Sequence, residues 1–113
     1  MRGLMGSLND LQRALEEESD EMFGDRWRKG SRLYWATALA GEVGELCNLV
    51  KKEARDGTDL TAQIGEEIAD IVITSFLTAS VLDLQVEEVV ARKRKLVRSR
   101  EGIRSTSRSV DSR

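Results

Sequence analysis

Three kinds of residue are absent or rare in this 113-residue sequence, which has no proline, no histidine and only 4% aromatic residues. Leu, Ala, Val, Glu and Arg are plentiful instead, and this mixture predicts an all-helical protein. Without histidine, the chain lacks the imidazole ligands typical of zinc and copper sites. Its length supports one domain with a modest core, a size at which association with a second copy often adds stability.

Cysteine is also scarce, since Cys47 is the only one in the sequence. A lone cysteine excludes an intramolecular disulfide and favours an intracellular protein. It lies in the stretch Leu46-Cys47-Asn48-Leu49, where we expect it to be a small packing residue. No apolar run is long enough for a signal peptide or a membrane span, so we expect a cytoplasmic protein with no membrane partner.

The formal net charge of -2 is too small to indicate a partner, but basic residues crowd the C-terminal end. They are Arg92, Lys93, Arg94, Lys95, Arg98, Arg100, Arg104, Arg108 and Arg113. Such an end can hold a polyphosphate beside an acidic metal site, or it can be a solvated helix face followed by a disordered tail. It also fits a non-catalytic helical module that binds nucleic acid. The near-neutral total charge and the lack of interleaved aromatic residues argue against nucleic acid.

Apolar spacing and helix-end signals predict four helices and no second domain. The predicted helices cover residues 8–22, 32–55, 60–82 and 85–100, with a loop at 23–31. We expect one helical domain over residues 1–104 and a disordered basic tail over 105–113. Short connections favour antiparallel neighbours and hence an all-α four-helix bundle. Ile73, Phe76 and Leu77 would leave apolar surface on the far side of the third helix, which indicates that dimerisation completes the bundle.

Two carboxylate pairs carry the chemistry: Glu42 with Glu45, and Glu67 with Asp70, each three residues apart in a predicted helix. This spacing stacks both acids of a pair on one helix face. A helical wheel places Glu42 and Glu67 beside the apolar stripes, and it leaves Glu66 facing solvent. Acids that lean toward a helix interface repel one another and lose hydration, a conflict that a divalent cation removes. Oxygen ligands suit Mg²⁺ or Mn²⁺, while an ordinary solvated helix face is the alternative.

The strings ALAGEVGELCNLVKK (residues 38–52) and GEEIADIVIT (residues 65–74) carry a family resemblance. In this order, on adjacent helices, they resemble the ExxE and ExxD motifs of the MazG-like nucleotide pyrophosphohydrolases, within the all-α NTP pyrophosphatase superfamily. The dCTP pyrophosphatase branch looks similar around GEVGEL, and the resemblance is strongest over residues 35–82. It implies a MazG-like bundle that hydrolyses a nucleoside triphosphate to the monophosphate and pyrophosphate with Mg²⁺, for which Mn²⁺ can substitute.

The resemblance also implies roles for single residues. Glu42, Glu45, Glu67 and Asp70 would hold Mg²⁺, and Glu42 or Glu45 would take the proton of the attacking water. Family members grip phosphates with basic and amide side chains on the last helix, and the candidates here are Lys93, Lys95, Arg98 and Arg100. The asparagine that the family carries on this helix is missing from this chain. For contacts with the base or sugar, the candidates are Gln12, Phe23, Trp27, Tyr34, Trp35 and Asn48.

The substrate stays open at this point. Phosphoribosyl-ATP pyrophosphohydrolases and dimeric dUTPases share the same metal-site chemistry, so either activity is an alternative to hydrolysis of a (d)NTP. Relatives pair their central helices into a larger bundle, with active sites near the interface, and we therefore expect a dimer or a tetramer.

Overall fold

The described part of the chain folds into four α-helices and one short 3₁₀ helix. The computed structural model describes residues 6–111, with side chains described for residues 6–102. The elements in chain order are α1 (Leu8–Phe23), η2 (Arg26–Lys29), α2 (Arg32–Asp56), α3 (Thr61–Val81) and α4 (Val86–Asp111). These residues form no strand, so the all-α prediction is confirmed, and α1 to α3 begin and end within one residue of their predicted bounds. None of the described helices has the length and apolar character needed to cross a bilayer.

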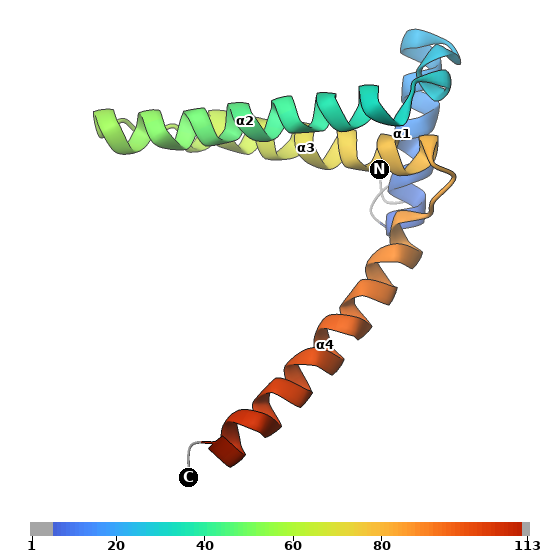
Figure 1. Ribbon diagram of the computed structural model, residues 1–113. Coiled ribbons are helices and arrows are strands. Elements are labelled where there is room, and N and C mark those ends of the chain that lie inside the picture. The colour runs from blue at the N-terminus through green and yellow to red at the C-terminus, as the bar shows by residue number, and fades with distance from the viewer. Residues whose placement is uncertain (1–5, 112–113) are drawn as a thin grey trace.

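The centre of the fold is an antiparallel hairpin of α2 and α3 (Figure 1). Ser31 caps α2, because its Oγ accepts a hydrogen bond from the backbone N–H of Tyr34 at 3.0 Å. Gly57 ends α2 in the left-handed conformation at φ 69°, which glycine adopts without steric cost. Beyond the turn, the N–H of Leu60 donates to the Glu53 carboxylate at 2.9 Å. This contact fixes the start of α3 against the last turns of α2.

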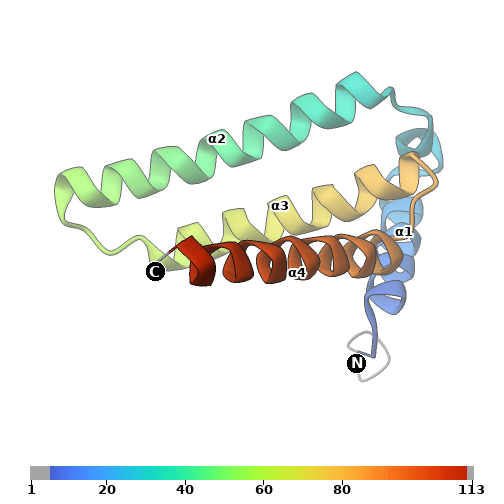
Figure 2. The ribbon, with the colours of Figure 1, turned by 60° about the horizontal axis from the view of Figure 1, so that its bottom comes forward.

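Helix α1 crosses the open end of the hairpin, where α2 begins and α3 ends (Figure 2). Gln12, which is only 2% exposed, ties these elements together. Its Nε2 donates to Ser80 Oγ and to the carbonyl of Leu84, each at 2.9 Å, and its Oε1 accepts from the N–H of Val86 at 2.9 Å. Since its amide nitrogen and oxygen both bond within the chain, Gln12 is a structural link and not the base contact that the sequence suggested.

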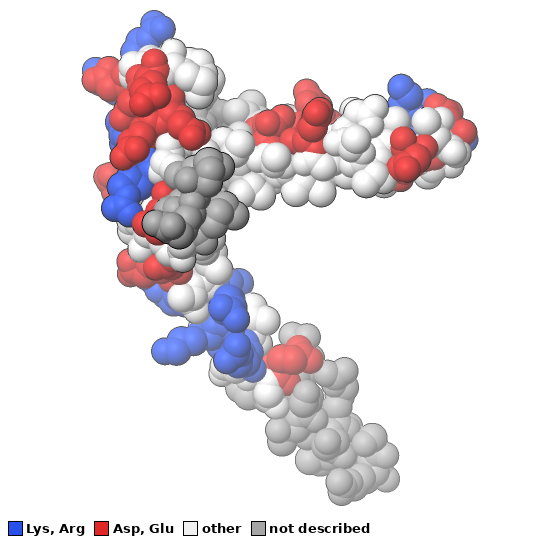
Figure 3. Space-filling view, turned by 180° about the vertical axis from the view of Figure 1, so that it is seen from behind, with Lys and Arg blue, Asp and Glu red and all other residues white. Residues whose placement is uncertain are grey.

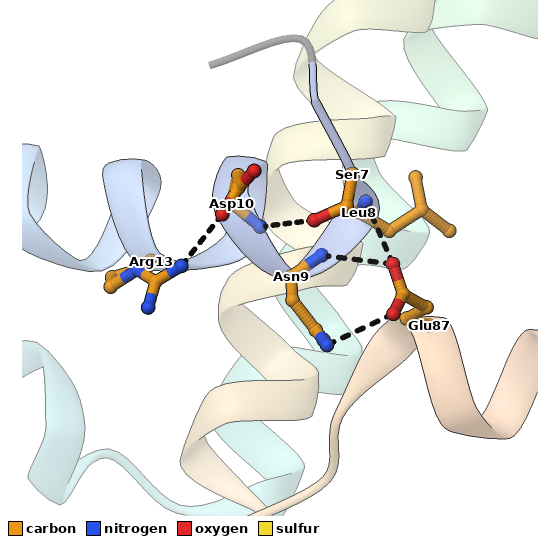
Figure 4. Close-up of polar contacts among 6 residues, drawn as sticks. All are labelled: Ser7, Leu8, Asn9, Asp10, Arg13 and Glu87. Atoms are coloured by element: carbon orange, nitrogen blue, oxygen red, sulfur yellow. Dashed lines mark hydrogen bonds and ion pairs between the residues drawn. The ribbon is translucent and has the colours of Figure 1, made fainter. Parts of the chain in front are cut away.

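Helix α4 is attached to α1 by its first turn. The Glu87 carboxylate accepts hydrogen bonds from the N–H groups of Leu8 and Asn9 at 3.1 and 3.4 Å, and from Asn9 Nδ2 at 3.0 Å (Figure 4). The first N–H groups of a helix have no partner within that helix. Glu87 therefore completes the start of α1 together with Ser7, whose Oγ accepts from the N–H of Asp10 at 3.1 Å. From this joint, α4 runs away from the α2–α3 hairpin (Figure 1).

The last helix runs past its predicted end at residue 100 and past Gly102, because α4 continues to Asp111. A glycine inside a helix costs about 1 kcal/mol relative to alanine. It ends a helix where the backbone turns left-handed, as at Gly57, whereas the backbone at Gly102 is helical. The side chains of Arg104, Arg108 and Arg113 lie outside the described residues. Whether residues 105–113 form a tail separate from the domain stays a prediction.

The described chain buries few apolar side chains, namely Leu15, Trp27, Trp35, Leu60 and Phe76. The prediction that Phe76 adds to an exposed face is wrong, because α1 packs on this end of α3. Cys47 is exposed and is not the packing residue that its apolar neighbours suggested, since no described helix covers its side of α2.

Apolar side chains on α3 and α4 are left without cover. Val90 and Val97 on α4 are 39% and 50% exposed, because α4 leaves the hairpin. Val72 and Ile73 on α3 are exposed as well. The radius of gyration is 18.5 Å, against about 13 Å for a compact domain of this length. The four helices are therefore an open arrangement within one chain.

Candidate metal centre

Three of the four motif acids meet between α2 and α3. Glu42, Glu67 and Asp70 can each present one carboxylate oxygen such that all three oxygens lie within 4.8 Å of one another. The i, i+3 spacing puts Glu67 and Asp70 on one side of α3, and the hairpin brings Glu42 of α2 opposite them. Figure 3 shows acidic side chains gathered midway along this hairpin. Glu45, the fourth acid, is exposed and is not one of these three, but its carboxylate lies close enough to Glu67 to raise the pKa of Glu67.

Glu67 is the least satisfied of these acids. Its Oε1 is buried and has no hydrogen-bond partner. Burial raises the pKa of Glu67, and the charge of Glu45 and a side-chain hydrogen bond with Glu45 raise this pKa further. The charges of Asp70 and Glu42 act in the same direction. Among the residues with described side chains, the ion pairs include none of the four acids. A hard divalent cation fits this donor set, because it would supply both the missing partner and the missing positive charge.

Glu42 is held by a residue that the sequence motifs did not single out. Thr74 Oγ1 donates a hydrogen bond to Glu42 Oε1 at 2.5 Å, across the interface between α3 and α2. Thr74 comes four residues after Asp70 and seven after Glu67, so the three side chains share one face of α3. Its position on the same face as the two acids was the only feature of the sequence that could have identified it, since threonine by itself is a common residue inside a helix.

Next to the acids lies a cavity of about 300 Å³ lined by Glu45, Asn48, Leu49, Lys52 and Glu67. The structure thus brings Asn48, a predicted sugar or base contact, beside two of the motif acids. Lys52 was not among the predicted phosphate ligands. Its spacing of seven residues from Glu45 put it on the same face of α2 and was the signal that could have found it.

The two tryptophans predicted to contact the base form a separate aromatic cluster. Trp27 and Trp35 are both buried and meet edge to face, with ring centroids 6.3 Å apart. The Nε1 of Trp35 donates to the carbonyl of Trp27 at 3.3 Å. A cavity of about 450 Å³ lies against them, and Phe23, Arg26 and Tyr34 also line it. Trp35 precedes Glu42 by two helical turns, so this cavity lies about 10 Å along α2 from the acids.

Asp20 holds η2, and with it Trp27, against α1. Its Oδ1 accepts from Trp27 Nε1 at 2.9 Å, and its two oxygens accept from the Arg28 guanidinium at 3.1 and 3.0 Å. The hydrogen bonds from Arg28, and then the one from Trp27, lower the pKa of Asp20. The Arg28 guanidinium also stacks on the Trp27 ring, 4.4 Å from its centroid. These contacts fix the aromatic cluster in place.

The predicted phosphate ligands lie apart from the acids within one chain. Lys93, Lys95, Arg98 and Arg100 are exposed on α4. Figure 3 shows Lys and Arg side chains gathered on the α4 arm, away from the acids on the hairpin. The structure therefore brings Glu42, Glu67 and Asp70 together. Asn48 and Lys52 lie nearby, but the basic residues of α4 of the same chain do not.

Comparison with known proteins gives a family for this chain. Neither the curated proteins nor the solved structures include a match to the chain. The family model of the MazG nucleotide pyrophosphohydrolase domain matches residues 31–102, which is more than half of the 113 residues. This range contains all four motif acids, Thr74 and Lys52. The chain therefore belongs to the MazG nucleotide pyrophosphohydrolase family.

Proposed function

We propose that the protein is a Mg²⁺-dependent hydrolase that converts a (d)NTP to the nucleoside monophosphate and pyrophosphate. The observation that carries this proposal is the convergence of Glu42, Glu67 and Asp70, with a buried oxygen of Glu67 that has no partner. Three neighbouring carboxylates that form no ion pair with a described side chain repel one another unless a cation binds them. Family membership supports the same kind of reaction.

Mg²⁺ held by Glu42, Glu67 and Asp70 would neutralise the negative charge of the substrate phosphates. In the proposed reaction, a water oxygen attacks the α-phosphorus while the α–β anhydride bond breaks and pyrophosphate leaves with the bonding electrons. Glu45 accepts the proton of this water. What supports Glu45 over Glu42 is that Glu45 is exposed and outside the three-acid group, whereas one oxygen of Glu42 already accepts a hydrogen bond from Thr74.

The substrate is proposed to lie along α2. The cavity beside Glu45 offers an amide from Asn48 and an ammonium from Lys52, which are suitable donors to phosphate or sugar oxygens. The base would then enter the aromatic cavity against Trp27 and Trp35, since flat apolar rings suit a nucleobase. The separation of about 10 Å between this cavity and the acids is one that a nucleotide can span.

Self-association forms part of the same proposal. The exposed apolar residues of α3 and α4 support it, and so does the open shape of the chain. Within one chain, the basic residues of α4 lie far from the acids. In a dimer or tetramer, α4 of a second copy can bring these residues close to the acids, namely Lys93, Lys95, Arg98 and Arg100. Light scattering coupled to gel filtration measures this directly, and a chain that stays monomeric at micromolar concentration contradicts it.

A nucleotide panel with Mg²⁺ or Mn²⁺, scored for monophosphate and pyrophosphate, tests the activity. The panel includes dCTP, dUTP and phosphoribosyl-ATP, so that it separates a (d)NTP pyrophosphohydrolase from the two related activities. Glu42→Ala and Asp70→Ala should reduce turnover to background without unfolding the protein. Glu66→Ala is the matched control, because Glu66 is exposed and stands outside the acid group. Full activity in Glu42→Ala would overturn the proposal, and salt-dependent DNA binding without turnover would favour a nucleic-acid-binding module.

A further inference from the structure

We infer that Thr74 is a positioning residue of the metal centre, whose hydroxyl holds the Glu42 carboxylate in the orientation that binds the cation. The inference rests on the proposed function, because it assigns a role toward the Mg²⁺ that the three acids would hold. It begins from one contact, the hydrogen bond from Thr74 Oγ1 to Glu42 Oε1 at 2.5 Å.

The direction of this hydroxyl distinguishes Thr74 from its neighbours on α3. Ser75 Oγ and Thr78 Oγ1 each donate at 2.7 Å to the carbonyl four residues earlier in the same helix. This is the usual way for a hydroxyl inside a helix to find a partner. The corresponding carbonyl for Thr74 is that of Asp70, yet Thr74 donates across the interface to Glu42 on α2 instead.

The location of Thr74 restricts Glu42 further. Thr74 is half-buried and β-branched, so its side chain has few rotamers to choose from. A glutamate side chain has three rotatable bonds, and fixing one of its oxygens removes much of that freedom. The cation then meets a carboxylate that is already oriented. Hydrogen bonds of this kind to ligating side chains typically change metal affinity or activity by about 10- to 100-fold when they are removed.

Thr74→Val tests the inference, because valine keeps the branched shape of threonine and replaces the hydroxyl with a methyl group that cannot donate a hydrogen bond. The readout is binding of Mn²⁺ alone, measured as the loss of the free-ion electron paramagnetic resonance signal during titration. We expect the Mn²⁺ dissociation constant to rise about tenfold or more in Thr74→Val. In turnover, the Mg²⁺ concentration for half-maximal rate should rise by a similar factor, with less change in kcat at saturating Mg²⁺.

Two further variants separate positioning from a general effect on the helix. Thr74→Ser retains the hydroxyl and should restore Mn²⁺ affinity to within a few-fold of the parent protein. Thr78→Val removes a hydroxyl one turn later that bonds only to the carbonyl of Thr74, and it should bind Mn²⁺ as the parent does. Circular dichroism establishes that each variant is folded at the temperature of the titration.

Unchanged Mn²⁺ affinity in Thr74→Val would overturn the inference, as would an equal loss in Thr78→Val. If Glu42→Ala loses Mn²⁺ binding while Thr74→Val retains it, the role of Thr74 fails and the proposed function stands. If the parent protein neither binds Mn²⁺ nor turns over a nucleotide, the proposed function fails and the inference fails with it.

Discussion

Asn9 and Glu87, 78 residues apart in the sequence, join the first turn of α1 to the first turn of α4. The Asn9 side chain donates to Glu87 Oε2 at 3.0 Å, and its backbone N–H donates to Glu87 Oε1 at 3.4 Å. The Glu87 carboxylate thus lies in the first turn of α4 and accepts hydrogen bonds from N–H groups that have no partner within α1. A negative charge at the start of a helix is also favourable to the helix dipole.

Glu87→Ala should therefore lower the free energy of unfolding by about 1–2 kcal/mol, because it removes charge-assisted hydrogen bonds to α1. Urea denaturation at fixed protein concentration measures the change. Glu88→Ala is the matched control, since Glu88 forms only an exposed ion pair with Arg92, at 2.9 Å. This control should change stability by less than about 0.5 kcal/mol. Equal effects of the two substitutions would mean that the contact with α1 contributes nothing measurable.

Lys52→Ala should raise the KM for the nucleotide about tenfold or more, because a charge-assisted contact with phosphate is lost. We expect a smaller effect on kcat, since Lys52 lies beside the acids but is not one of the groups proposed to act on the water. Lys51→Ala provides the comparison: it removes the same charge about 100° around α2. If the two variants show the same KM, the effect is one of net charge, and Lys52 is not a phosphate contact.

Glu67→Gln should stabilise the metal-free protein at neutral pH. The pKa of Glu67 is raised in the folded state by burial and by the neighbouring acids, above the ordinary glutamate value of 4.5. The folded state then binds the proton more tightly than the unfolded state, so stability falls as pH rises from 4.5 through the raised value. Glutamine does not titrate, so the variant does not lose stability in this way as the pH rises.

Thermal melts in EDTA measure the effect of Glu67→Gln. The gain in melting temperature should be present at pH 7 and should shrink as the pH falls toward 4.5, where Glu67 of the parent takes up a proton. Added Mg²⁺ should stabilise the parent and not the variant. A variant that is less stable than the parent in EDTA at pH 7 would show that Glu67 is not in conflict with its neighbours.

Gly30→Ala should disturb the aromatic cluster. A Cβ atom at residue 30 would lie 2.6 Å from Trp35 Nε1 and 3.1 Å from Trp35 Cδ1, so the indole must move. We expect a loss of about 1–3 kcal/mol, typical of overpacking, and a shift in tryptophan fluorescence. Gly65→Ala is the control, because Gly65 lies within α3 and a Cβ atom added there would meet no described atom within 4 Å apart from its own neighbours in the helix. This substitution should be neutral or stabilising by about 1 kcal/mol. A Gly30→Ala protein with unchanged fluorescence would contradict the described packing.

Local patterns predicted the helices and the acids well. The bounds of α1, α2 and α3 follow from caps and apolar spacing within each segment, and the i, i+3 spacing of Glu67 and Asp70 is a property of one helix. Thr74 and Glu87 were not predicted, because their partners Glu42 and Asn9 lie far away in the sequence. Which side chains pair between two helices depends on how the helices cross. The spacing of residues within one helix does not predict such pairs.

The direction in which α4 leaves the hairpin also could not be predicted from the sequence. The apolar residues of this helix would be buried in a closed bundle, but the turn after α3 sends α4 away from the hairpin. A pattern of apolar residues shows that a helix face needs cover. It does not say whether that cover comes from the same chain or from another copy.

The short turn between α2 and α3, residues 57–60, has a consequence for the order of folding. Helices joined by so few residues meet early, because contacts of low sequence separation have little loop-closure entropy to overcome. The hairpin that carries the acids should thus form in a fast step whose rate is independent of protein concentration. Burial of the α3 and α4 faces against a second copy would be a slower, second-order step, and dilution would delay only that one.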